Sequence, residues 1–243
     1  MSPLLAFENV TKRVADVSGR SVSILDAVSF VVDRGETVGL WGMRRSGKST
    51  LLRIAAGMQA PDEGVVRFAG HDLTRLSRAE VAQLLRTSIG LASAEWHATR
   101  NEIVVDHVAL PALSYGASLR HAHTAAREVL ERVGVASRAD MRIAELSPGE
   151  RTRIAIARAL VRNPLLLLVD EPGSTPSPTD RDEIYALLRS LAGDPALTLM
   201  VASEDVAAIR TARRAMTLAD GMLRSSGGGG QVLPFPGQRA SSS

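Results

Sequence analysis

Short apolar segments separated by helical patterns give this chain the layout of a sheet with helices packed around it. The segments 37–41, 165–169 and 197–202 are almost wholly apolar, which is typical of strands buried on both faces of a parallel sheet. Alternating or mixed patterns predict further strands at 4–10, 22–33, 65–68 and 88–92. The expected fold class is therefore α/β.

Helical periodicity fills most of the remaining chain. The clearest case is 124–134, where apolar side chains gather on one side and charged side chains on the other. Further helices are expected at 51–57, 78–86, 180–191 and 204–214, and the whole stretch from 101 to about 161 has a helical pattern. A final hairpin is expected at 215–223.

These elements indicate one large domain over residues 1–224, with a helical subdomain of about 95–160 inserted into it. Residues 225–243 include four consecutive glycines and the sequence Pro234-Phe235-Pro236, and they show no periodicity. We expect this segment to be a disordered tail.

The composition narrows the classes of partner. The chain of 243 residues has no cysteine, so neither disulfides nor thiol chemistry is expected, and a cytoplasmic setting fits. No apolar run approaches the roughly 20 residues that span a bilayer, so we expect no direct membrane span. The net charge is only +3 and the arginines are interspersed with acids, so we expect no nucleic-acid binding.

The clearest chemical motif follows the strand at 37–41 and fits the pattern G-x-x-x-x-G-K-[ST] of a phosphate-binding P-loop. Its glycines let backbone N–H groups surround a phosphate, and the following helix adds its free N-terminal N–H groups. Lys48 would reach the β- and γ-phosphates, and the Ser49 hydroxyl would hold Mg²⁺. The predicted nucleotide-binding residues are Gly42, Met43, Arg44, Arg45, Ser46, Gly47, Lys48, Ser49 and Thr50.

Two carboxylates, Asp170 and Glu171, end the apolar strand at 165–169. Ligands of α/β sheets bind at the carboxyl ends of the strands, and P-loop NTPases place an aspartate there to hold Mg²⁺. The sequence therefore predicts Ser49 and Asp170 as magnesium ligands. A neighbouring glutamate is placed to polarise the attacking water, so Glu171 is the predicted catalytic base.

Between these motifs lies Leu146-Ser147-Pro148-Gly149-Glu150, followed by Arg151-Thr152-Arg153-Ile154-Ala155-Ile156-Ala157-Arg158-Ala159-Leu160. This stretch resembles the L-S-G-G-Q signature and helix of ABC ATPases. The order of motifs across residues 4 to 224 is similar to that of ABC transporter nucleotide-binding domains. Residues 101–116 look like the segment that follows the Q-loop in the lipoprotein-release and macrolide-exporter branch of that family. The implied fold is an ABC-type P-loop NTPase, with a mixed central sheet flanked by helices, an antiparallel β subdomain and a helical insert.

The resemblance also implies partners and roles. Two such domains pair head to tail, as a homodimer or a heterodimer, with ATP between one chain's P-loop and the other's signature. Ser147, Pro148, Gly149 and Glu150 form the signature, of which Ser147 and Gly149 would contact the partner's γ-phosphate. The helical insert would touch transmembrane permease subunits, so the chain would be peripheral on the cytoplasmic face of the cell membrane.

Several positions depart from the family pattern. Arg45 replaces the third P-loop glycine, and a side chain there costs about 1–2 kcal/mol if φ is positive, so we expect Arg45→Gly to tighten ATP binding. Pro148 replaces the first signature glycine and removes one N–H. Four further elements lack the family's residue: the adenine-stacking position (Val14), the Q-loop (Ala94, beside Glu95), the D-loop (174–177) and the switch histidine (Ser203).

The interpretation is an ATP-binding subunit of an ABC transporter that binds and hydrolyses ATP with Mg²⁺ to drive or regulate transport through separate membrane subunits. One alternative is a degenerate, non-hydrolysing regulatory subunit that pairs with an active ATPase. A soluble P-loop kinase is another, although it would not explain the signature segment. A soluble ABC-type ATPase of DNA repair or translation would generally carry paired domains or a long coiled coil, neither of which this sequence contains.

Overall fold

The computed structural model describes residues 2–15, 19–93, 101–175 and 177–225. The central element is a six-stranded sheet in the order β10-β9-β3-β8-β7-β6. Its strands β3, β6, β7, β8 and β9 run parallel, and β10 pairs with β9 in the antiparallel direction. The bounds are β3 (Thr37–Trp41), β6 (Ile89–Ser93), β7 (Leu166–Asp170), β8 (Thr198–Ser203), β9 (Arg214–Ala219) and β10 (Met222–Ser225).

A second sheet of four antiparallel strands lies beside the first, in the order β2-β1-β4-β5. Its strands are β1 (Leu5–Ala15), β2 (Ser21–Val32), β4 (Glu63–Phe68) and β5 (His71–Asp72). Ala69 and Gly70, both with positive φ, make the turn that lets β5 pair with β4. Phe7 and Phe30 stack across β1 and β2 with ring centroids 4.7 Å apart.

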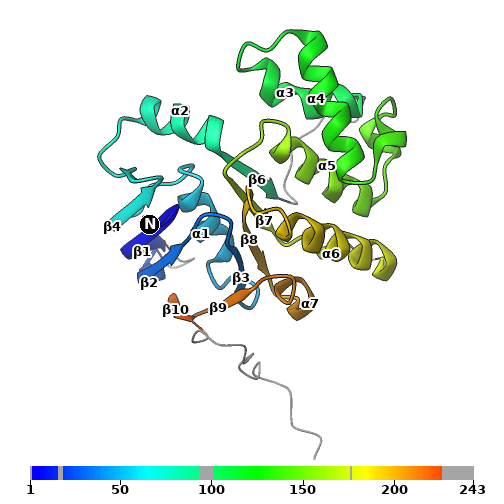
Figure 1. Cartoon of the computed structure of the whole chain (residues 1–243). Coiled ribbons are helices and arrows are strands. Elements are labelled where there is room, and N and C mark those ends of the chain that lie inside the picture. Colours follow the sequence, from blue (N-terminus) through cyan, green and yellow to red (C-terminus); the bar gives the residue numbers. More distant parts are fainter. Residues whose placement is uncertain (1, 16–18, 94–100, 176, 226–243) are drawn as a thin grey trace, which may run out of the picture.

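Helices cover the central sheet and form a separate lobe, drawn in green in Figure 1. The lobe contains α3 (Val104–Leu113), α4 (Leu119–Arg132), two short 3₁₀ turns (Ala136–Arg138 and Ile143–Glu145) and α5 (Pro148–Leu160). The other helices are α1 (Lys48–Ala55), α2 (Arg78–Ser88), α6 (Pro178–Ala192) and α7 (Val206–Ile209). The observed fold is the expected mixed sheet with an antiparallel β part and helices.

The hydrophobic core has two parts, one on each face of the central sheet. One part packs α1 between the two sheets, with Leu51 and Leu52 fully buried against strand residues such as Leu40. The other joins the helical lobe and α6 to the opposite sheet face. The two parts hold α1 and α5 in fixed positions near the carboxyl ends of β3 and β7.

One predicted helix is wrong. The segment 204–214 forms only the single turn of α7, and Arg214 already belongs to β9. The chain must return to the sheet here, and Gly39 allows a close approach, since a Cβ at that position would meet Ile209 and Ala212. The helix predicted at 124–134 starts earlier, at Leu119, because Ser118 caps it by accepting a hydrogen bond from the His121 N–H.

The segment expected to be a disordered tail lies almost wholly outside the described residues. Ser225 ends β10, and 226–243 are not among the residues described. Within the described part of the chain, no helix is long and apolar enough to cross a membrane.

Candidate nucleotide-binding site

The predicted P-loop connects β3 to α1 at the carboxyl edge of the central sheet. Gly47 caps α1 with φ 101°, a conformation that glycine adopts without strain. Within the described chain no side chain caps this helix, and its first turn contains no acidic residue. The first-turn N–H groups and the positive end of the helix dipole are therefore available to an anion.

Arg45 adopts φ 63°, which places an exposed, non-glycine residue in the left-handed region. The predicted strain at Arg45 depends on a positive φ, and that condition is therefore confirmed. A side chain in this conformation carries about 1–2 kcal/mol of backbone strain.

Lys48 is buried, with 4% of its side chain exposed, and its ammonium group has three oxygen partners. The Nζ atom donates to the carbonyl oxygens of Gly42, at 2.7 Å, and Met43, at 3.0 Å. It also lies 3.0 Å from Oε1 of Glu171, whose side chain is 29% exposed. The folded structure thus joins the P-loop lysine directly to the predicted catalytic glutamate.

Asp170 and Ser49 face each other at the end of β7 and the start of α1. Burial raises the pKa of the Asp170 carboxyl, while a hydrogen bond from Ser49 opposes that rise. Its Oδ1 atom is buried and, among the described residues, accepts no hydrogen bond. A buried carboxylate oxygen without a partner beside a hydroxyl oxygen is a donor set that suits Mg²⁺, so these residues fit that ion.

Glu171 is held from the side of β8 by two donors. The Ser203 hydroxyl donates to Oε2 of Glu171 at 3.1 Å, and the Glu204 N–H approaches the same oxygen at 3.2 Å. The Glu171 backbone has φ 47° and its N–H donates to the Ala202 carbonyl at 2.8 Å. A non-glycine residue kept in this conformation is the kind of local strain that clusters at functional sites.

A hydrogen-bonded chain extends from Ser203 into the protein. Ser203 Oγ accepts from the Asp205 N–H at 3.0 Å, and Asp205 accepts from the Tyr185 hydroxyl at 2.6 Å. Ser203 is the residue that the sequence resemblance predicts at the switch-histidine position. The sequence could suggest that replacement, but the contact between Ser203 and Glu171 depends on the pairing of β7 with β8.

The signature segment forms the first turn of α5. Ser147 is the N-cap and Pro148 is the first helical residue, and Ser147 and Glu150 bond each other's backbone N–H groups in a capping box. Burial favours a higher pKa for Glu150, but hydrogen bonds from Ser147 and Arg138 lower it overall. Gly149 is buried and its N–H donates to Oδ2 of Asp180 at 3.2 Å, a contact that sequence reasoning missed.

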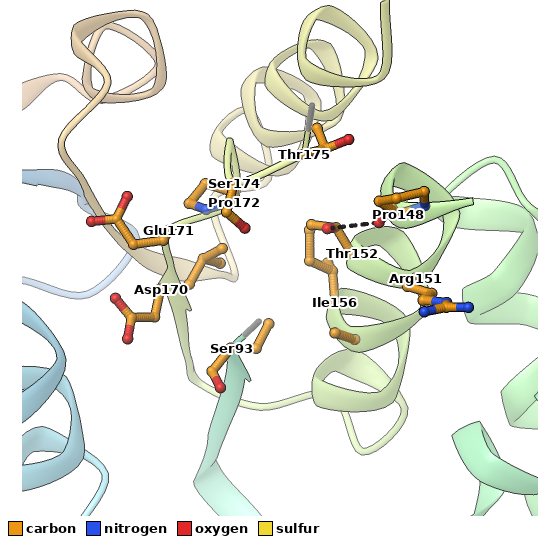
Figure 2. Close-up of a pocket in the computed structure, with 13 residues that line it drawn as sticks. Ser93, Pro148, Arg151, Thr152, Ile156, Asp170, Glu171, Pro172, Ser174 and Thr175 are labelled. Atoms are coloured by element: carbon orange, nitrogen blue, oxygen red, sulfur yellow. Dashed lines mark hydrogen bonds between the residues drawn. The ribbon is translucent and has the colours of Figure 1, made fainter. Parts of the chain in front are cut away.

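A cavity of about 270 Å³ separates the signature from the two carboxylates within the chain. Figure 2 shows Asp170 and Glu171 on one side of it, with Pro148 and Thr152 of α5 on the other. The structure thus brings the P-loop lysine together with both carboxylates and leaves the signature on the opposite wall.

The structure places the other positions that were predicted to depart from the family pattern as follows. Val14 is on β1 and 40% exposed. Ser177 caps α6, while Pro176 lies outside the described residues. Ala94 and Glu95, the predicted Q-loop position, also lie outside the described residues.

The fold and site define a P-loop nucleotide-binding protein. A sequence profile of the ABC transporter family matches residues 25–174. The lipoprotein-releasing system ATP-binding protein LolD of Chromohalobacter salexigens is 35% identical over 220 residues, covering 90% of this chain and 92% of that protein. The protein of the same name from Myxococcus xanthus is 36% identical over 218 residues, covering 90% and 97%.

Solved structures agree with the sequence relatives. The dimeric ATP-binding cassette MJ0796 bound to ADP and Pi superimposes with a TM-score of 0.85 at 27% identity, covering 93% of this chain and all of that one. CbiO1 of Clostridium perfringens, part of the ABC transporter complex cbiONQ, gives 0.78 at 24% identity, covering 92% and 88%. The chain belongs to the ABC transporter family, as an ATP-binding subunit.

Proposed function

We propose that this chain binds ATP at its P-loop and hydrolyses it with Mg²⁺, as the ATPase of a transporter whose membrane-spanning subunits are separate chains. The observation that carries the proposal is the convergence of Lys48, Glu171 and Asp170 at the N-terminal end of α1, where the helix presents open N–H groups. Each of these groups has a defined task in phosphate chemistry.

The P-loop residues Gly42 to Thr50 surround the phosphates, and Lys48 binds the β- and γ-phosphates. Ser49 and Asp170 would hold Mg²⁺, and the ion would supply positive charge against the phosphate oxygens. Glu171 orients and polarises the attacking water. Ser203 and the Glu204 N–H hold the Glu171 carboxylate in place. The Ser203 hydroxyl therefore does at least the positioning that the family's switch histidine would do.

The relatives also support a proposal for the wider assembly. Relatives named as ATP-binding proteins of a lipoprotein-releasing system support the lipoprotein-release branch of the family, with permease subunits as partners. The dimeric cassette MJ0796 supports a head-to-tail pair in which the signature Ser147 to Glu150 faces a second nucleotide site. In this arrangement the domain of 1–224, with its helical insert of about 95–160, sits on the cytoplasmic face of the membrane.

ATP binding by the purified chain with Mg²⁺, and ATP hydrolysis by the chain within its assembled transporter, test the site. Lys48→Ala should abolish ATP binding, because the phosphate charge loses its buried partner. Lys12→Ala is the matched control, since Lys12 is the only other lysine and pairs with Asp62 away from the P-loop. Equal ATP affinity in Lys48→Ala and Lys12→Ala would contradict the proposal.

Glu171→Gln separates binding from chemistry. We expect this variant to bind ATP and to lose turnover, because an amide cannot accept the proton of the attacking water. Turnover of the assembled transporter that is equal with Glu171→Gln and with the unmodified chain would remove Glu171 from the role of catalytic base. Copurification with coexpressed permease subunits from the same genome tests the membrane partnership, and its absence would favour a soluble ATPase.

A further inference from the structure

The first turn of α5 has no backbone N–H group left for a phosphate. Pro148 has no N–H, the Gly149 N–H donates to Asp180, and the Glu150 N–H donates to the Ser147 hydroxyl. The next N–H, of Arg151, donates to the Ser147 carbonyl at 3.0 Å, as in any regular helix. An anion approaching this helix end would have to displace one of these partners.

Asp180 is the unusual member of this arrangement, because it comes from a different helix. It lies in the first turn of α6, and its Oδ2 is 3.2 Å from the Gly149 nitrogen and 3.4 Å from the Thr175 hydroxyl. A Cβ on Gly149 would collide with the Asp180 carboxyl group, so the signature backbone and this carboxylate are in direct contact.

A comparison with α1 shows what this contact changes. The P-loop helix has a glycine cap, no side-chain cap among the described residues and no acid in its first turn. The signature helix has a serine cap, a glutamate in its first turn and a second carboxylate from Asp180. The first helix end is open to an anion, whereas the second already holds one.

Helix capping alone does not account for Asp180. The capping box formed by Ser147 and Glu150 already satisfies two N–H groups of this turn. Asp180 adds a negative charge at the one remaining N–H, which is the signature group that the proposed dimer would direct at a phosphate.

We infer that Asp180 prevents the signature of this chain from binding the γ-phosphate of a partner's nucleotide. This inference rests on the proposed function. Two copies of the chain would each place a carboxylate against the other's phosphate, and such like-charge contacts weaken an interface strongly. The partner that completes the P-loop site is therefore a second ATPase chain with an open signature, and not a second copy of this chain.

The test uses dimer formation with ATP, measured by size exclusion with light scattering in the Glu171→Gln background, which keeps ATP intact. The purified Glu171→Gln chain should remain monomeric with ATP and Mg²⁺. Adding Asp180→Ala should produce an ATP-dependent dimer, with a dimer dissociation constant lower by about 100-fold, the size expected for removing a close like-charge contact. Asp180→Ser should act in the same way, and it keeps a polar group in the first turn of α6.

Two further variants serve as controls. Asp182→Ala removes the same charge from an exposed position two residues away and should leave the chain monomeric. Pro148→Gly restores the N–H that proline lacks but leaves the carboxylate in place, and it should also remain monomeric. A dimer in either control comparable to that of Asp180→Ala would overturn the inference.

The remaining outcomes are equally decisive. Dimerisation of Glu171→Gln with Asp180 intact, or monomers in both Asp180 variants, would overturn the inference. Calorimetric ATP binding by every variant separates these results from failure of the proposed function. Absence of any Lys48-dependent ATP binding would overturn the proposed function itself.

Discussion

The contact between Lys48 and Glu171 predicts that the catalytic glutamate competes with nucleotide. Lys48 Nζ lies 3.0 Å from Glu171 Oε1, and a phosphate bound to the same ammonium group competes with that carboxylate. Replacing Glu171 by glutamine removes the competing charge. We therefore expect Glu171→Gln to bind ADP more tightly than the unmodified chain does, while the nucleotide-free variant is less stable.

The size of the effect follows from the surroundings of the pair. Two unit charges at this separation attract by about 1 kcal/mol in water and by several times more in a protein interior. Lys48 is buried, but Glu171 is 29% exposed, so solvent screening keeps the net contribution near that of partly exposed pairs, about 1 kcal/mol. This free energy corresponds to about a five-fold gain in ADP affinity.

Isothermal titration with ADP is the suitable assay, because ADP is not consumed by residual turnover. Thermal unfolding without nucleotide should show a lower melting temperature for Glu171→Gln, and saturating ADP should reduce that difference. Glu204→Gln removes the same charge from an exposed side chain nearby and should leave ADP affinity within about twofold. Unchanged or weaker ADP binding in Glu171→Gln would refute the argument.

Three other predictions follow from single contacts. Arg45→Gly relieves strain of about 1–2 kcal/mol at φ 63° and should tighten ATP binding by up to about thirtyfold; an unchanged dissociation constant would refute this prediction. Ser203→Ala removes one of the two donors to Oε2 of Glu171 and should lower the kcat of the assembled ATPase by about tenfold with little change in KM, while a proportionate rise in KM would assign Ser203 to binding. Burial and the nearby Arg158 charge lower the pKa of His107, which is 1% exposed, although Glu102 opposes this. The unfolded chain then binds the proton more readily, so the free energy of unfolding by urea should fall as the pH drops below about 6.5, the ordinary value for histidine, and His107→Phe should flatten this dependence.

The sequence predicted most of the fold because its strong signals are local. The apolar runs that became β3, β7 and β8 are short and continuous, as is typical of buried strands, and the P-loop pattern carries its own turn, helix start and chemistry. Helix boundaries were less accurate where local pattern and tertiary packing disagreed. The segment after β8 has helical composition, but the chain must rejoin the sheet as β9, and only four residues remain helical.

The sequence by itself determined the family, the P-loop and the two carboxylates, since each depends on residue types at fixed short spacings. Only the tertiary structure decided how those groups meet. The contact of Glu171 with Ser203 requires β7 and β8 to be neighbours in the sheet, and the contact of Asp180 with Gly149 joins the starts of α6 and α5. Residues 31 or 32 positions apart come together only when strand pairing and helix packing are complete, because no local preference of the chain encodes those distances.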